Sequence, residues 1–285
     1  MALLFLPQRA ASAHFCKMEL IVMNLSVMTL NLRVNNPEDG NNAWPFRINR
    51  VSEVIKLTQP FIIGTQEGLF SMLSDLQKCL PEYGMIGSGR GGGREDEHCA
   101  IFYKKQEVEV KDHGQFWLSQ TPTVANSISW KSACPRICTW GAFNLAKNPA
   151  VKFLVFNTHL DHVSQTAREK GIQLIWAKMN AYIKKGLPVI LTGDLNAGPE
   201  NKTIQFLHGL DTIERQSANL IDAFSVLMHA PGATFHDFRG GKEGQPIDYI
   251  YTSLGVKILE TKVDRSIIDG GYPSDHYPVT ADLII

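Results

Sequence analysis

Polar side chains occur where the apolar segments of this 285-residue chain end. They are carboxylates, amides and imidazoles: Asn31, Glu67, His159, Asp194, Asn196, Asp248, Asp275 and His276. A carboxylate at the end of an apolar strand is costly to desolvate without a partner. A single such residue, such as Asp194 taken alone, is often only a helix cap or a turn residue. A series at successive strand ends favours a shared crevice, because the strand ends of an α/β sheet converge there.

The residue types in this set indicate phosphate chemistry. Glu67 and Asp275 are hard oxygen ligands of the kind that Mg²⁺ or Mn²⁺ prefers. The histidines come with neither a thiolate nor an H-E-x-x-H helix, which argues against a zinc protease. Cleavage of a phosphate ester needs a hard cation, a carboxylate base, amide donors and imidazoles, and the chain contains candidates for each of these protein groups.

Strand-like and helix-like patterns alternate along the chain. Apolar runs predict strands at residues 20–32, 61–67, 100–103, 139–145, 151–158, 188–192, 245–251 and 279–285. Apolar residues at three- and four-residue spacing predict helices at 46–57, 69–80 and 167–185. No linker or charge block divides the chain, so we expect one layered α/β domain over residues 20–285. Irregular loops are expected at 34–45, 84–98, 112–136 and 229–246.

Composition sets limits on partners and compartment. Hydrophobic residues make up 44% and charged residues 20%, a balance typical of a globular protein. The 28 Lys and Arg residues equal the 28 Asp and Glu residues, so a polyanion would have to be recognised locally. Five scattered cysteines form no disulfide framework, which favours a reducing, cytoplasmic compartment. We expect a monomer.

The N-terminal residues resemble a targeting segment only weakly. A basic n-region is missing, and Pro7 interrupts the apolar stretch, so residues 1–19 are expected to be a disordered extension. No apolar run approaches the roughly 20 residues that a membrane-spanning helix needs.

Six short motifs resemble those of the endonuclease/exonuclease/phosphatase superfamily, whose members include DNase I, deadenylases and inositol-phosphate 5-phosphatases. In the family's order, they are NLR at 31–33, QE at 66–67, THLDH at 158–162, GDLNAGP at 193–199, IDYI at 247–250 and SDHYPV at 274–279. FWLS at 116–119 and RICTW at 136–140 resemble a microbial, single-domain branch. The resemblance covers residues 20–285 and implies a four-layered α/β sandwich, two sheets face to face with helices outside.

The resemblance also implies roles for the metal ligands. Glu67 would bind Mg²⁺, for which Mn²⁺ could substitute, with Asn31 beside it and Asp275 completing the coordination. The active site would lie at one end of the two sheets.

For the reacting groups, the resemblance implies that Asp194 orients or deprotonates the attacking water and that Asn196 holds the water or a phosphoryl oxygen. His276, paired with Asp248, and His159 would contact the scissile phosphate. An acid partner raises the pKa of a histidine and so favours a cationic phosphate donor. Which residue acts as base and which as acid stays open, because coupled groups titrate together.

Other residues have two interpretations of similar weight. Tyr103 matches a position where relatives place a tyrosine or arginine near the phosphate, or it is an ordinary strand-edge aromatic. His162 would reach the leaving group, or it is a solvated loop residue. Arg136 and Arg168 would approach the phosphate, or each forms an exposed salt bridge.

The leading functional hypothesis is a Mg²⁺-dependent nuclease that hydrolyses phosphodiester bonds of nucleic acid by in-line attack of water. The sequence does not indicate whether such a nuclease would act as an endonuclease or as an exonuclease. The alternative is a phosphatase or phosphodiesterase of a small or lipid phosphate ester, such as an inositol phosphate or sphingomyelin. A third reading, a non-catalytic binding module, is disfavoured because Glu67, Asp194 and His276 are all present.

Overall fold

Residues 24–285 are described by the computed structural model. The expected extension over residues 1–19 and the first four residues of the expected strand at 20–32 lie outside this range. Among the described residues, none of the helices is both long and apolar enough to cross a membrane.

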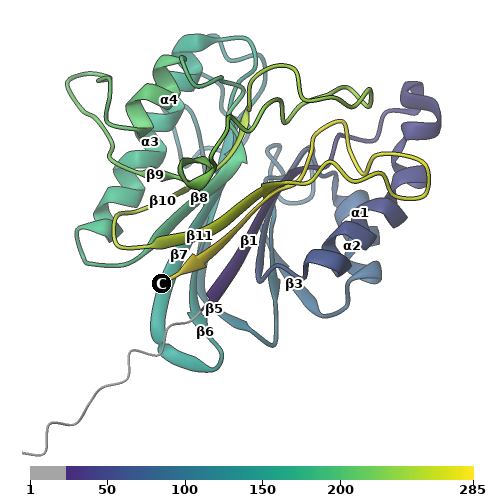
Figure 1. The fold of residues 1–285 in the computed structure, drawn as a ribbon. Coiled ribbons are helices and arrows are strands. Elements are labelled where there is room, and N and C mark those ends of the chain that lie inside the picture. The colour runs from purple at the N-terminus through teal and green to yellow at the C-terminus, as the bar shows by residue number, and fades with distance from the viewer. Residues whose placement is uncertain (1–23) are drawn as a thin grey trace, which may run out of the picture.

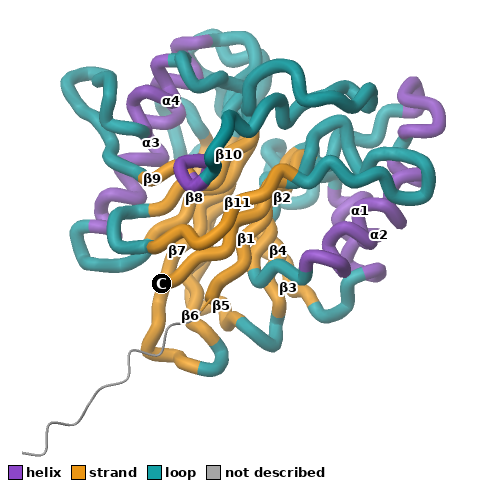
Figure 2. The backbone as a smooth tube through the Cα atoms, in the orientation of Figure 1, coloured by secondary structure: helices purple, strands orange, loops and turns teal. Residues whose placement is uncertain are grey.

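Two six-stranded mixed sheets form the centre of the molecule, with α1 and α2 on one side and α3 and α4 on the other (Figures 1 and 2). The first sheet has the order β11 (Lys257–Val263), β12 (Val279–Ile284), β1 (Asn24–Asn31), β2 (Ile62–Gln66), β4 (Ile101–Lys104) and β3 (Tyr83–Ile86). The second has the order β5 (Val108–Trp117), β6 (Ile137–Leu145), β7 (Asn148–His159), β8 (Val189–Asp194), β10 (Asp248–Thr252) and β9 (Ile221–Asp222). The predicted α/β sandwich is confirmed.

The helices follow the apolar spacing of the sequence. They are α1 (Trp44–Thr58), α2 (Phe70–Cys79), α3 (Gln165–Ile183) and α4 (Lys202–Leu207), with short 3₁₀ turns η1 (Pro37–Asn42) and η2 (Ala223–Val226). In α1, Val51, Val54 and Ile55 are buried at the spacing of one helix face. This face packs with α2 on the first sheet and forms a hydrophobic cluster separate from the larger core between the sheets.

Several elements differ from the prediction. Strands β3, β5, β9 and β11 and helix α4 were not predicted. Strand β3 takes up the first three residues of the expected loop at 84–98, and β5 runs to Trp117, so the expected loop at 112–136 begins only after that residue. In β11 the sequence KILETKV alternates polar and apolar residues over a short length, and pairing with β12 stabilises it.

Strand pairing in the sheet centres determines where the site forms. In the first sheet β1 and β2 run parallel, with Asn31 opposite Gln66. In the second, β7 and β8 run parallel with His159 opposite Asp194, and antiparallel β10 brings Asp248 opposite Asp194 as well. The polar ends of these strands therefore meet at one edge of the sandwich.

A polar seam joins the two sheets directly below that edge. It consists of Gly64, Gln66, Asn157 and Thr192. Asn157 Oδ1 accepts hydrogen bonds from Gln66 Nε2 at 2.7 Å and from Thr192 Oγ1 at 3.1 Å, and all three side chains are buried. The sheets approach so closely here that a Cβ on Gly64 would lie 2.6 Å from Asn157 Oδ1. Only glycine fits at position 64 without a shift of its neighbours.

Candidate active site

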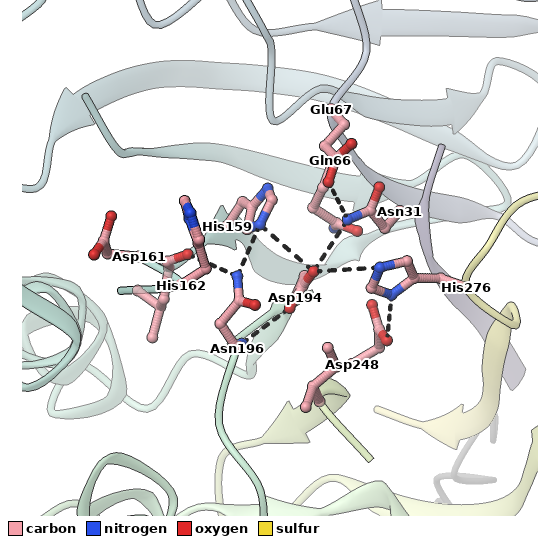
Figure 3. A network of polar contacts seen from close by, with 12 residues as sticks. Asn31, Gln66, Glu67, His159, Asp161, His162, Asp194, Asn196, Asp248 and His276 are labelled. Carbon is pink, nitrogen blue, oxygen red and sulfur yellow. Dashed lines mark hydrogen bonds and ion pairs between the residues drawn. The ribbon is translucent and has the colours of Figure 1, made fainter. Parts of the chain in front are cut away.

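Asp194, the last residue of β8, lies at the centre of a polar network (Figure 3). Asn31 Nδ2 donates to Asp194 Oδ2 at 3.0 Å and to Glu67 Oε1 at 2.9 Å, which connects the two sheets. The backbone N–H of Asn196 donates to Asp194 Oδ1 at 2.9 Å. Burial, together with the neighbouring Asp248, raises the pKa of Asp194 to about 7. A carboxylate with such a pKa is suited to exchange a proton near neutral pH.

His276 lies on one side of Asp194 and is positively charged. Its Nδ1 is 2.9 Å from Asp248 Oδ2, and its Nε2 is 3.8 Å from Asp194 Oδ2. Burial alone would lower the pKa of His276, but the negative charge and hydrogen bond of Asp248 outweigh it and raise the pKa to about 10. The imidazolium can therefore donate a charge-assisted hydrogen bond to an oxyanion.

His159 lies on the other side of Asp194 and is neutral. Its Nε2 is 3.5 Å from Asp194 Oδ2 and accepts a hydrogen bond from Asn196 Nδ2 at 2.9 Å. Its Nδ1 is buried and has no hydrogen-bond partner among residues 24–285. Burial first, and then the positive charges of Arg136 and His276, hold the pKa of His159 well below its usual value.

Strained backbone aims several of these side chains into the site. Arg33, Glu67 and Asn196 all have positive φ, at 55°, 60° and 47°, and each follows the end of a strand. This conformation is costly for residues other than glycine and concentrates at functional sites. Hydrogen bonds hold it in place, since Val34 N donates to Glu67 Oε2 at 2.9 Å.

Two carboxylates are candidates for binding a divalent cation. Glu67 and Asp275 both line the pocket, and burial, with Glu67 adding to it, raises the pKa of Asp275. Carboxylate oxygens match the preference of a hard cation. Asp194, Asp248 and His276 also bring ligand atoms within 4.8 Å of one another. His276 is poorly suited to that role, because a protonated imidazole has no lone pair to offer a metal.

The network opens into a pocket of about 530 Å³. Of the predicted site residues, Glu67, His159, Asp194, Asn196, Asp275 and His276 line it. Asn31 and Asp248 are buried directly behind and reach it through their hydrogen bonds to Glu67, Asp194 and His276.

Tyr103 does not belong to the site, and that prediction is wrong. It pairs with Ile62 at the start of β2, whereas Glu67 follows the end of that strand. Its ring packs against Phe143, with centroids 5.9 Å apart. Because β4 runs antiparallel to β2, the last residues of β4 are carried away from the site.

The structure shows where three other residues with open interpretations lie. Arg136 is buried and lines the pocket, whereas His162 lines it but is exposed, so both interpretations of His162 stay open. Arg168 does not line it and instead donates to Asp161 O at 2.8 Å.

Several pocket residues were missed from the sequence, among them Arg90, Glu97 and Phe235. These three lie in loops that were predicted as irregular, and no motif marked them as site residues. A signal existed only at Phe235, an aromatic residue in a polar stretch.

Comparison with known proteins agrees with this geometry. Residues 28–276 match the model of the Endonuclease/Exonuclease/phosphatase family. A family member from Bacteroides thetaiotaomicron superposes with a TM-score of 0.84 at 31% identity, covering 93% of this chain and 98% of that one. A mannosyl-6-phosphatase from the same organism gives 0.82 at 31% identity, covering 92% and 100%.

A more distant relative is Protein angel of Drosophila melanogaster, 24% identical over 96% of this chain and 81% of its own length. The chain is therefore a phosphoester hydrolase that belongs to the endonuclease/exonuclease/phosphatase family.

Proposed function

We propose that this enzyme is a Mg²⁺-dependent hydrolase of small phosphate esters that uses direct attack of water. The observation that carries the proposal is the position of Asp194 between a cationic and a neutral histidine at the base of one pocket. An oxyanion donor and a proton acceptor are then both within reach of one phosphoryl group.

Each side chain has a role that follows from its charge. His276 donates from Nε2 to a phosphoryl oxygen, and Asp248 maintains its charge. Asp194 accepts the proton of the attacking water. Asn31 keeps the Asp194 carboxylate oriented through its hydrogen bond. A divalent cation held by Glu67 and Asp275 would neutralise charge on the phosphoryl oxygens. Mg²⁺ is the proposed ion, with Mn²⁺ as its substitute.

A small substrate is favoured over the nucleic acid that ranked first from the sequence. A pocket of about 530 Å³ is typical of sites for small molecules. The net charge of zero provides no general attraction for a polyanion. The similarity to a mannosyl-6-phosphatase further supports a phosphorylated sugar or a compound of that size.

A substrate panel tests the proposal. We would measure release of phosphate or product from hexose phosphates, inositol phosphates, sphingomyelin vesicles, and single-stranded DNA and RNA, with Mg²⁺, Mn²⁺ or EDTA. The proposal predicts metal-dependent turnover that is fastest on a small ester. Faster cleavage of an oligonucleotide would instead establish the nuclease, and inactivity on every ester would contradict both.

The monomeric state and the cytoplasmic compartment stay predictions. Cys79, Cys99, Cys134 and Cys138, which lie in the described part of the chain, are all free thiols there. Free thiols support a reducing compartment.

A further inference from the structure

Two arginines that line the pocket have no role in the mechanism above. They are Arg90 and Arg136, and we call this pair the arginine wall. The two residues come from separate loops, before β4 and before β6, yet both line the pocket that contains Asp194. In Figure 3, His162, the partner of Arg136, lies on the side of Asp194 away from His276.

Arg136 is buried but poorly satisfied. Its side chain is only 6% exposed, and its Nη2 donates to His162 Nδ1 at 2.9 Å. Among the residues that the structure describes, this is the one hydrogen bond of the Arg136 side chain. The Nε of Arg136 is buried without an acceptor. A buried guanidinium Nε–H without an acceptor is costly unless a ligand supplies one.

The nearest carboxylate cannot fill that role. Asp161 Oδ2 is 3.8 Å from Arg136 Nε, too far for a hydrogen bond. Both oxygens of Asp161 are already occupied by four other donors: the Ser132 hydroxyl and the backbone N–H groups of Ala133, Val163 and Ser164. Asp161 therefore holds the loops together and leaves Arg136 available.

Arg90 gives the wall its rigidity. Its Nη2 donates to Glu97 Oε1 at 2.8 Å, and its Nη1 donates to Cys134 Sγ at 3.3 Å. Its carbonyl accepts from Trp117 Nε1 at 2.7 Å. The loops on either side of the wall are thus fastened to each other. Arg33, the other pocket arginine, donates two hydrogen bonds to Asp39, and its Nε lies 3.7 Å from Asp275 Oδ2, so carboxylates already neutralise its charge.

The wall and the reacting centre share one pocket, because Arg90 and Arg136 line it together with His159 and Asp194. Consistent with this, the positive charges of Arg136 and Arg90 contribute, after burial, to lowering the pKa of His159. His159 Nε2 is in turn 3.5 Å from Asp194. A phosphoryl group next to Asp194 would therefore lie in the field of the wall.

We propose that Arg136, supported by Arg90, binds the third terminal oxygen of a phosphomonoester and makes the enzyme select monoesters over diesters. The inference rests on the proposed function and specifies its substrate class. A monoester has three terminal oxygens and two negative charges when fully ionised, whereas a diester has two such oxygens and one charge. The additional oxygen and charge need additional donors, and a diester would place a neutral ester group against a guanidinium whose Nε–H has no acceptor.

The test compares p-nitrophenyl phosphate with methyl p-nitrophenyl phosphate, which share a leaving group and differ by one methyl on a terminal oxygen. We expect Arg136→Ala to lower kcat/KM for the monoester about 30-fold or more and to change that for the methyl ester less than about threefold. Arg136→Lys should fall between, because it keeps the charge but loses the planar fork. Equal losses on both substrates, or no loss on the monoester, would overturn the proposal.

Arg94→Ala is the matched control. Arg94 is in the same loop as Arg90, is exposed, lies over the Phe70 ring at 4.2 Å and does not line the pocket. Its removal should leave both rates unchanged, and circular dichroism should confirm that every variant is folded.

A second measurement keeps the proposal testable if Arg136→Ala fails to fold. At pH 8, inorganic phosphate is mostly a dianion, and dimethyl phosphate is a monoanion. Wild-type enzyme should be inhibited by phosphate at a concentration at least about tenfold lower than by dimethyl phosphate. Similar inhibition by both, or hydrolysis of the methyl ester as efficient as that of the monoester, would refute the selectivity and leave the proposed function intact. Failure to hydrolyse either ester with any metal would instead remove the proposed function.

Discussion

The two sides of Asp194 use the same residue type for opposite purposes. On one side His276 has a second acid partner, Asp248, at its Nδ1 and is cationic, whereas on the other His159 has only the shared Asp194 near its Nε2, has no partner at its Nδ1 among residues 24–285, and is neutral. Both are almost completely buried, so desolvation acts on both in the same direction. The difference lies in the neighbours, since a second carboxylate adjoins one and arginines adjoin the other. A histidine's role is therefore determined by the charge next to it more than by its burial.

Asp194→Asn should have the largest effect, because it removes the group that both sides share. The amide keeps the volume but cannot accept a proton, so kcat should fall about 10³-fold or more with little change in melting temperature. Steady-state rates on the preferred ester, with a thermal melt as control, would measure this. Activity near the wild-type level would show that the proton acceptor is another residue.

Asp248→Asn should remove the difference in charge between His276 and His159. Without the carboxylate, the pKa of His276 should fall, and the imidazole should lose much of its positive charge at neutral pH. We expect a loss of about 10²-fold in kcat. Titration of the His276 ring by NMR in wild type and variant would check the cause. An unchanged pKa would contradict the role given to Asp248.

Glu67→Gln should affect metal dependence and leave the histidines as they are. Loss of one carboxylate should raise the Mg²⁺ concentration needed for half-maximal rate about tenfold or more, with activity recovering at high metal. A Mg²⁺ titration after treatment with EDTA measures the shift. If the titration curve is unchanged, Glu67 is not a ligand.

Tyr103→Phe should have the smallest effect. The ring packs between the sheets away from either histidine, and its hydroxyl does not reach the pocket. We expect kcat/KM within about twofold of wild type. A larger kinetic loss without a loss of stability would restore the catalytic reading of this tyrosine.

The sequence indicated most of the residues that gather at the base of the pocket and few of those at its rim. Asn31, Glu67, His159 and Asp194 each follow an apolar run and Asp248 begins one in an antiparallel strand, and strand pairing brings these positions together. Local pattern is sufficient there, because the strands in the sheet centre can pair in few ways.

Residue positions that depend on contacts between distant segments of the chain could not be predicted from the sequence. Tyr103 was misplaced because its position depends on the antiparallel return of β4, which a short apolar run does not specify. Arg90 was missed because its loop is positioned by side-chain contacts with Glu97 and Cys134. Such contacts leave no periodic trace in the sequence.

The polar seam of Gly64, Gln66, Asn157 and Thr192 has a consequence for how the enzyme loses activity on heating. Each sheet supplies only part of the reaction centre, with Asn31 and Glu67 on one and His159, Asp194 and Asp248 on the other. A slip of one sheet past the other by an ångström would separate groups that must act together, although both hydrophobic clusters would persist. Warming should therefore inactivate the enzyme a few degrees before the polypeptide melts. A methyl group added at Gly64 should widen that gap.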